Sequence, residues 1–239
     1  MSPTSTTRDD ETQARPQLMT LVEYATGELR ERILAGDLPA GERLLLDGIA
    51  EDLGISPIPL REALRSLAGE GLVSPLPRRG YTIAQATAED LEETYRLRLV
   101  LEPLAVELAV PMLTPKDLVE LRAEFELARI AIDEADWRAH RLHHRAFHFT
   151  IYNRCGSVWL VRFTEMLWAN SERYQRMTTQ IRGGLMERVT EHQAVLDACE
   201  QRDAKAASKA MHVHLENAFV LLRGFLAENE TVASNDDVT

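Results

Sequence analysis

The sequence contains few cysteines and no long apolar run. Two cysteines, Cys155 and Cys199, occur among 239 residues, too few for a disulfide framework or a thiolate zinc site. Each lies in a segment with helical periodicity, so we expect both to be small, buried, apolar residues. No window approaches the roughly 18 consecutive apolar residues that a membrane-spanning helix needs. The first 17 residues lack the apolar core of a signal peptide, so we expect a cytoplasmic globular protein with no membrane partner.

Positive charge is also scarce. The formal net charge is −11, which on average disfavours a nucleic-acid partner because phosphate contacts require local positive charge. Residues 56–83 are an exception, since their four arginines and two glutamates give a net charge of +2. This segment is therefore the part of the chain that best suits contact with DNA.

The chain divides into two parts with different periodicity. Residues 1–16 and 230–239 are polar and aperiodic, which predicts disordered tails. Residues 17–86 contain three short helical patterns and then two strand-like pieces joined by the turn PRRG. Residues 87–229 contain six helical patterns with short links, of which the first two begin at Thr87 and Thr114. The predicted fold is mainly α, with an N-terminal winged helix-turn-helix followed by an all-α antiparallel helical bundle.

The third helix of the first part has the features of a helix that reads DNA. Its apolar residues recur at i, i+3, i+4 and i+7 and predict one buried face: Leu60, Ala63, Leu64 and Leu67. Arg61 and Arg65 lie one turn apart off that face, where they can reach DNA. In the alternative interpretation Arg61 pairs with Glu62 or Glu70 on a solvated surface. Ser56 precedes the helix, whose free N–H groups suit a phosphate.

Four segments of this part, LRERILAGDLPAGERL, IAEDLGIS, PLREALRSLAGEGLV and PRRGYTI, resemble the DNA-binding domain of the GntR superfamily of bacterial transcription regulators. The residues that this resemblance implies for the major groove and its phosphates are Ser56, Arg61 and Arg65. Those that it implies for a wing tip in the minor groove are Arg78, Arg79 and Gly80. Pro57 and Gly48 depart from the family pattern, which often has a basic or polar residue at the first position and arginine or glutamate at the second.

Four of the seven histidines fall within HRLHHRAFH, residues 140–148. Residues four apart in a helix differ in direction by about 40°, so His140, His144 and His148 share a stripe while His143 points elsewhere. Two histidines at i and i+4 can aim both rings at one metal ion. The pair alone is weak evidence for a metal, because surface helices also carry histidines by chance.

Two further histidines, His192 and His214, lie on helices with apolar flanks. A bundle interior that receives imidazoles from three helices either satisfies each with a hydrogen bond or binds a cation, and four convergent neutral donors favour the cation. Ligation by nitrogen alone suits a divalent transition metal, with zinc expected first and nickel, cobalt or iron as the other choices.

Residues 88–228 resemble the FCD domain, the all-helical ligand-sensing domain of FadR-like GntR regulators, through LRLVLEPLAVELA, HRAFHFTIYNRCGS, EHQAVLDACEQRDAKAA and AMHVHL. The resemblance implies that His148, His192 and His214 are metal ligands. His144 stands where the family most often has an acidic ligand, and His140 is the alternative to it. Four neutral imidazoles would leave the ion with a formal charge of +2, so we expect the site to hold an anion firmly.

The same resemblance implies an effector carboxylate beside the metal. Arg98, in YRLRLVLE, matches the family arginine that holds such a carboxylate with two parallel hydrogen bonds. In the alternative interpretation Arg98 forms an i, i+4 ion pair with Glu102. Asn153, Arg145 and Arg173 are further candidates for effector contacts.

The sequence therefore predicts a DNA-binding transcription regulator, acting as a repressor, and not an enzyme. We expect a homodimer on a palindromic operator of double-stranded DNA, controlled by a small carboxylate metabolite at the metal. One alternative is a metal-dependent enzyme with a DNA-tethering domain, but the nearby carboxylates show no helical spacing to the histidines that suggests a general base: Glu165, Glu191 and Asp197. Another alternative is a regulator with a purely structural metal.

Overall fold

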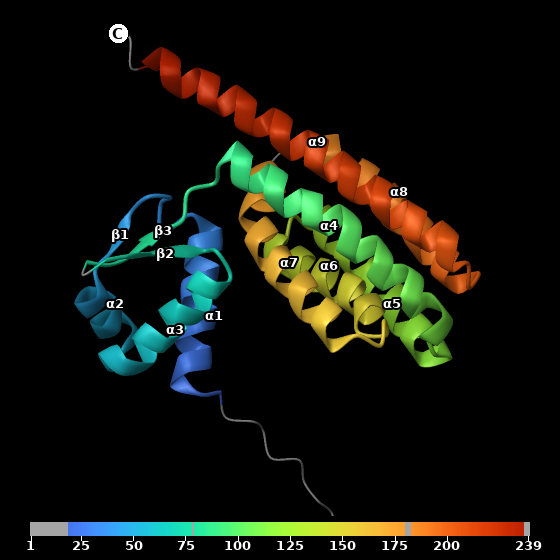
Figure 1. The fold of residues 1–239 in the computed structure, drawn as a ribbon, viewed down its shortest axis with the longest axis horizontal. Helices are drawn as coiled ribbons and strands as arrows, with labels where there is room; N and C mark the ends of the chain where they lie inside the picture. Colours follow the sequence, from blue (N-terminus) through green and yellow to red (C-terminus); the bar gives the residue numbers. More distant parts are fainter. Residues whose placement is uncertain (1–18, 78, 180–182, 237–239) are drawn as a thin grey trace, which may run out of the picture.

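The computed structural model describes residues 19–77, 79–179 and 183–236, which form an N-terminal part and a helical bundle (Figure 1). The N-terminal part combines helices with a small sheet, and the bundle consists of helices only. In the bundle the long last helix lies beside the first one (Figure 1). The predicted fold class, mainly α with a winged helix-turn-helix before an all-α bundle, is confirmed.

The elements of the N-terminal part follow the predicted order with one addition. They are α1 (Leu21–Ala35), β1 (Arg43–Leu44), α2 (Leu46–Leu53), α3 (Pro57–Gly69), β2 (Val73–Leu76) and β3 (Gly80–Ile83). The strands form an antiparallel sheet in the order β1-β3-β2, in which Arg43 pairs with Thr82 and Ser74 also pairs with Thr82. The sequence predicted β2 and β3 but not β1, because two residues are too few to show an alternating pattern.

Helix α3 packs through the face that the sequence predicted. Leu60, Ala63, Leu64 and Leu67 are fully buried. They join a core with Ala25 and Leu29 of α1 and Val73 and Ile83 of the sheet. This packing fixes α3 against α1 and leaves the opposite face of α3 in solvent.

The bundle contains six α-helices and one short 3₁₀ helix within the described residues. They are α4 (Ala88–Ala109), η1 (Val110–Met112), α5 (Pro115–Asp133), α6 (Trp137–Tyr152), α7 (Val158–Thr179), α8 (Gly183–Glu200) and α9 (Ala204–Asp236). The predicted starts at Thr87 and Thr114 are confirmed, since each threonine hydroxyl accepts a hydrogen bond from the third backbone N–H of its helix. Pro115 occupies the first helical position, where its missing N–H costs nothing.

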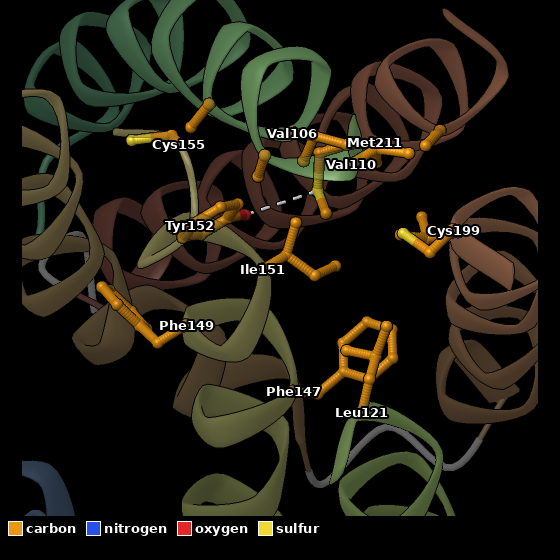
Figure 2. Close-up of a cluster of buried hydrophobic side chains, with 14 of the residues drawn as sticks. Val106, Val110, Leu121, Phe147, Phe149, Ile151, Tyr152, Cys155, Cys199 and Met211 are labelled. Atoms are coloured by element: carbon orange, nitrogen blue, oxygen red, sulfur yellow. Dashed lines mark hydrogen bonds between the residues drawn. The ribbon is translucent and has the colours of Figure 1, made fainter. Parts of the chain in front are cut away.

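The bundle core is built from all of its helices (Figure 2). Phe147, Ile151 and Tyr152 of α6 point into it together with Met211 of α9 (Figure 2). Cys155 and Cys199 are both buried at this cluster, as predicted, and they lie at separate places in it (Figure 2). Burial raises the pKa of the Cys199 thiol to about 12, which keeps the sulfur protonated and unreactive.

The C-terminal boundary differs from the prediction. The sequence predicted a disordered tail from residue 230, whereas α9 continues to Asp236. No glycine or proline follows Gly224, so no residue in the sequence interrupts the helix there. The other predicted tail, residues 1–16, lies outside the described residues. Among the helices that the structure describes, none combines the length and the apolar character needed to cross a membrane.

Candidate functional site

Four histidines from three helices of the bundle come together at one point. His144 and His148 lie one turn apart on α6, His192 lies on α8 and His214 on α9. One ring nitrogen of each lies within 4.8 Å of those of the others. The Nε2 atom of His192 is 3.0 Å from Nε2 of His144 and 3.0 Å from Nε2 of His148. The fold thus brings together the four residues that the sequence selected, and their ligation of a metal stays a prediction.

The hydrogen bonds of the other ring nitrogens determine the tautomers. Nδ1 of His192 is 2.6 Å from the carbonyl oxygen of Arg188, which can only accept, so this nitrogen carries the proton. Nδ1 of His214 likewise donates to a carboxylate oxygen of Glu191, at 2.8 Å. In a neutral imidazole the second nitrogen is then an unprotonated acceptor. The Nε2 atoms of both rings therefore present lone pairs to the centre of the cluster.

His148 is held in the same way through a relay. Its Nδ1 is 2.9 Å from the hydroxyl oxygen of Tyr152, and that hydroxyl donates its own proton to Glu102 at 2.5 Å. The tyrosine oxygen must therefore accept from Nδ1–H of His148. Hydrogen bonds of this kind to the outer nitrogen orient metal-ligating histidines and raise their basicity.

Burial keeps the cluster uncharged. His148 is fully buried, and His192 and His214 are nearly so. Burial, reinforced by the neighbouring histidines, lowers the pKa values of His144, His148 and His192 well below the ordinary value. Burial lowers the pKa of His214 to about 3, with Arg188 and Arg98 adding to the effect. All four rings are neutral at neutral pH, which is the form that binds a metal.

The arrangement fits a bound cation. The Nε2 atoms of His148 and His192 lie 3.0 Å apart, and no proton is available to lie between their lone pairs because the Nδ1 atoms of both rings carry the ring protons, so the two lone pairs repel. A separation of 3.0 Å is instead compatible with two nitrogens that share a metal at about 2.1 Å. His144, His148, His192 and His214 are therefore the residues that could hold a divalent transition metal.

Two carboxylates lie directly behind the ligands. Glu191 accepts from His214 and also from Asn217, at 2.6 Å, while Glu102 accepts from Tyr152 behind His148. Glu191 therefore places a negative charge one hydrogen bond away from His214, while the expected charge of the metal site stays a prediction. The sequence named Glu191 but did not reveal this contact, because the contact crosses from α8 to α9 and has no helical spacing.

The remaining histidines have partners outside the cluster. Nδ1 of His140 lies 3.1 Å from the carbonyl of Ala128, and the ring stacks on His144 with centroids 5.5 Å apart. His143 pairs with Glu124 at 2.8 Å. His212 lies 3.3 Å from the carbonyl of Leu99, which receives no helical hydrogen bond because residue 103 is a proline.

Of the two interpretations of Arg98, the ion pair with Glu102 is confirmed and the effector contact stays a prediction. Its side chain is 1% exposed, and its Nε donates to Glu102 at 2.6 Å, so the i, i+4 ion pair exists and is buried. Its guanidinium also lies over the ring of Trp168, with the central carbon 5.2 Å from the ring centroid. The Nη1 atom is buried and has no hydrogen-bond partner among the described residues. Arg98 thus retains one donor for another group.

Two small cavities adjoin the histidines. One, of about 10 Å³, is bordered by Arg98, His144 and His214. The other, of about 50 Å³, is bordered by His144 and His192 and has an apolar wall formed by Phe125, Phe147 and Val189. The smaller cavity is close to the space of one water molecule. These dimensions suit a small ligand rather than a long chain.

The other three predicted effector residues border neither of these two cavities. Asn153 is exposed at the end of α6, because five residues beyond His148 the helix has turned by about 140°. Arg145 is half exposed, pairs with Glu165 at 3.6 Å, and lies in a cleft of about 850 Å³ between the two parts of the chain. Arg173 contacts the N-terminal part instead.

The predicted DNA-contacting residues of α3 are accessible. Ser56 is the N-cap of α3, and its hydroxyl makes no capping hydrogen bond. Arg61 and Arg65 are exposed. Arg65 is 3.3 Å from Glu62, an exposed pair of the kind that contributes about 0–1 kcal/mol and can exchange for a phosphate. Glu70, the other partner considered for Arg61, pairs with Arg30 at 2.6 Å.

The wing supplies a third exposed arginine. Arg79 lies in the turn between β2 and β3, and its carbonyl accepts from Nε of Arg43 at 3.1 Å. Gly80 has a φ of 92°, a conformation that only glycine adopts without strain. Arg78, the remaining predicted wing residue, lies outside the described residues.

Comparison with known families accounts for both parts of the chain. Residues 21–83 match the family described as bacterial regulatory proteins, gntR family, and residues 93–217 match the FCD domain. The two matches lie on either side of the change from mixed to all-helical structure, and the FCD match covers just over half of the chain.

Known proteins with similar sequences are named as transcription regulators. The HTH-type transcriptional regulator McbR of Escherichia coli (strain K12) is 36% identical over 141 residues. These residues are 59% of this chain and 64% of McbR, so the match spans less than two thirds of that protein. The HTH-type transcriptional repressor GlaR of the same strain is 27% identical over 214 residues, which are 84% of this chain and 95% of GlaR. A solved structure of E. coli McbR/YncC matches with a TM-score of 0.76 and 28% identity, covering 86% of this chain and 98% of that one.

Removal of one ligand should abolish metal binding. We expect His192→Ala, purified after zinc loading, to retain less than about a tenth of the metal held by the unaltered protein, because three remaining ligands bind far more weakly. Glu191→Gln should weaken zinc affinity about 10- to 100-fold, because the partner of His214 loses its charge. His212→Ala is the matched control, since His212 is exposed and outside the cluster. Metal analysis measures all three, and a full equivalent of zinc in His192→Ala would contradict the assignment.

The buried histidines should make the metal-free protein acid-sensitive. An unfolded histidine has a pKa of about 6.5. The folded values are lower, so below about pH 6.5 the unfolded chain binds more protons and protonation favours unfolding. The thermal unfolding midpoint of chelator-treated protein should therefore be highest above about pH 6.5 and fall between about pH 7 and pH 5.5. The midpoint of the zinc-loaded protein should fall less over this pH interval. An equal fall of the midpoint in both forms would count against the prediction.

Proposed function

Because this chain belongs to the GntR family of bacterial regulatory proteins and carries an FCD domain, we propose that it is a repressor controlled by a small carboxylate at a histidine-held metal. Its first part is a DNA-binding domain of a family of transcription regulators, and its relatives McbR and GlaR are named as such regulators. The proposal concerns what controls the binding of this domain to an operator.

The observation that carries the proposal is the convergence of unprotonated nitrogens. His192 and His214 donate through Nδ1 to acceptors outside the cluster, so their Nε2 lone pairs point inward with those of their neighbours. A divalent metal bound there would supply positive charge and open coordination positions to an anion. Nitrogen-only ligands favour zinc, nickel, cobalt or iron over magnesium and calcium.

Arg98 and the cavity beside it support a carboxylate as the anion. Two of the histidines, His144 and His214, line the cavity of about 10 Å³ together with Arg98. The Nη1 donor of Arg98 is buried without a partner among the described residues, and such a donor is costly to leave unbound. A carboxylate oxygen would satisfy it, while Glu102 holds the rest of the guanidinium in place.

Exposed apolar side chains support a homodimer formed by a second copy of this chain. Four apolar residues recur at i, i+3, i+7 and i+11 along one face of α4, and each side chain is between 44% and 62% exposed: Leu97, Val100, Leu104 and Leu108. Helix α7, which packs on α4, adds a second apolar face. Its side chains are each between 45% and 65% exposed: Trp159, Phe163 and Met166. Monomeric proteins seldom expose so much contiguous apolar surface, and aromatic residues are enriched in interfaces. A two-fold dimer requires an operator with two-fold symmetry.

A metal-dependent enzyme and a purely structural metal remain as alternatives. The enzyme is disfavoured because two carboxylates beside the histidines, Glu191 and Glu102, are already committed to hydrogen bonds behind the rings rather than free to act as a base. A structural metal would need no spare donor near the histidines, whereas Arg98 lines the adjoining cavity and its Nη1 has no partner among the described residues.

The proposal predicts metal-dependent release of DNA. Sheared genomic DNA would be incubated with the purified protein at about physiological salt, and the bound fragments would be recovered and sequenced. These fragments should share one palindromic sequence. One acid from a panel of small mono-, di- and hydroxycarboxylates should release that DNA, and release should disappear in His192→Ala. Arg98→Lys should keep its zinc but need about tenfold more acid, because a lysine lacks the planar fork in which Nη1 would bond the acid while Nε and Nη2 bond Glu102.

The readouts separate the alternatives. Fluorescence anisotropy of the labelled operator gives DNA affinity, and metal analysis of the same samples gives the zinc content. If chelation lowers the thermal unfolding midpoint but leaves release by the acid unchanged, the metal is structural. Failure to enrich any palindrome, with or without the acids, would reject the regulator and its dimer.

A further inference from the structure

The bundle contacts the DNA-binding part through a small group of polar side chains on α7. Arg173 donates from Nη1 to the carbonyl oxygen of Gly71 at 3.0 Å. Gly71 lies in the link between α3, the predicted recognition helix, and β2, the first strand of the wing. Elsewhere between the two parts, Arg141 of α6 donates to Glu31 of α1 at 2.7 Å.

Arg173 joins three segments with one guanidinium. Besides Gly71, its Nη2 atom bonds the carboxylate of Asp90 in the first turn of α4 and lies 3.0 Å from the hydroxyl oxygen of Tyr174. Tyr174 itself donates to Asp90 at 2.6 Å, and Asn170 donates to Thr94 at 2.8 Å. The Arg173 side chain is 11% exposed, whereas that of Asp90 is 41% exposed, so water reaches the carboxylate but hardly the guanidinium. Charged hydrogen bonds from one nearly buried guanidinium to several partners favour a single arrangement of those partners.

The contact surface at Gly71 is closely packed. Gly71 has a φ of 73°, which favours glycine, and a Cβ atom at this position would lie 2.9 Å from Oδ1 of Asn170. The backbone of the link therefore rests against α7 with no room for a side chain. Its carbonyl is held by Arg173 on the same side, so the end of α3 is fixed to α7 by both packing and a charged hydrogen bond.

We propose that Arg173 is a positioning residue for DNA binding, which sets the direction of the recognition helix relative to the bundle. In a dimer joined through the bundle, this direction determines the distance between the two recognition helices and hence the operator spacing that the protein accepts. The inference rests on the dimer of the proposed function and is independent of the metal. Arg173 therefore acts on DNA through Gly71 rather than by touching a phosphate or an effector.

The same helix also reaches the histidines. Trp168, one turn and a half before Arg173 on α7, lies with its ring centroid 4.7 Å from that of His148 and 5.3 Å from that of His144. Its Nε1 donates to Glu172 at 3.4 Å. Helix α7 thus contacts the candidate metal centre through Trp168 and the DNA-binding part through Arg173.

Operators with altered spacing test the proposal. Four proteins would be compared: the unaltered full-length chain, Arg173→Met, Arg173→Lys and Arg122→Met. Each would be titrated with the recovered palindrome, with versions that have one base pair more or one fewer between the half-sites, and with a single half-site. Arg122 is the matched control, because it also holds a carboxylate, that of Glu200 at 2.5 Å, but within the bundle. Thermal unfolding midpoints report whether each variant is folded.

We expect the unaltered protein and Arg122→Met to prefer the natural spacing by about tenfold or more. The affinities of Arg173→Met for the different spacings should lie within about threefold of one another. Its affinity for the single half-site should stay within about twofold of that of the unaltered protein. Arg173→Lys, which keeps the charge beside Asp90 but cannot bond both partners as a fork, should show an intermediate ratio and guards against misfolding of the methionine variant.

The outcomes distinguish this inference from the proposed function. If the unaltered protein is selective and both folded Arg173 variants are equally selective, the positioning role is wrong and the dimer stands. If Arg173→Met loses affinity for the half-site as strongly as for the palindrome, Arg173 supports the fold of the DNA-binding part and the inference is overturned. If the unaltered protein accepts all spacings equally, the dimer and the positioning role both fail.

Discussion

The structure of the bundle depends on the approach of four imidazole rings in its buried interior. Three helices deliver these rings, and each outer nitrogen with a described partner donates its proton away from the centre: His148 to Tyr152, His192 to the Arg188 carbonyl and His214 to Glu191. The inward nitrogens of these three rings therefore carry lone pairs that repel one another and that a bound cation would accept. Glu191 would place a negative charge one hydrogen bond away from such a cation, while the charge of Glu102 is balanced by Arg98.

The position of the cluster connects it with the rest of the chain through α7. Trp168 lies against the histidine rings and the Arg98 guanidinium, and Arg173 on the same helix holds the link that follows α3. A change in the geometry of the histidines therefore has a short physical route to the recognition helix. The route is a packed helix rather than a flexible linker, and a ligand shifts the domain arrangement only as far as its binding differs between arrangements.

The local features of the fold could be read from the sequence because they depend on short spacing. The buried face of α3, the starts of α4 and α5 at Thr87 and Thr114, and the stripe shared by His144 and His148 all follow from helical periodicity and capping. Strand β1 could not be predicted, since two residues carry no periodic signal. The end of α9 was placed too early because a polar composition was taken for disorder.

Contacts between helices were the part that sequence spacing could not supply. Glu191 reaches His214 across two helices, and Arg173 turns toward Gly71 rather than toward the cavity beside Arg98. Both depend on how neighbouring helices are rotated about their axes. Arg98 and Glu102 show the opposite case, because a four-residue spacing predicted their pairing while only the fold revealed that the pair is buried at the histidines.

The central claim, that four imidazoles hold one metal ion, is tested most directly by X-ray absorption at the zinc edge of the zinc-loaded protein. The account predicts nitrogen or oxygen neighbours at about 2.0–2.1 Å, outer-shell scattering from about four imidazole rings, and no sulfur neighbour. Scattering from two imidazoles or fewer, or a sulfur neighbour at about 2.3 Å, would contradict the account.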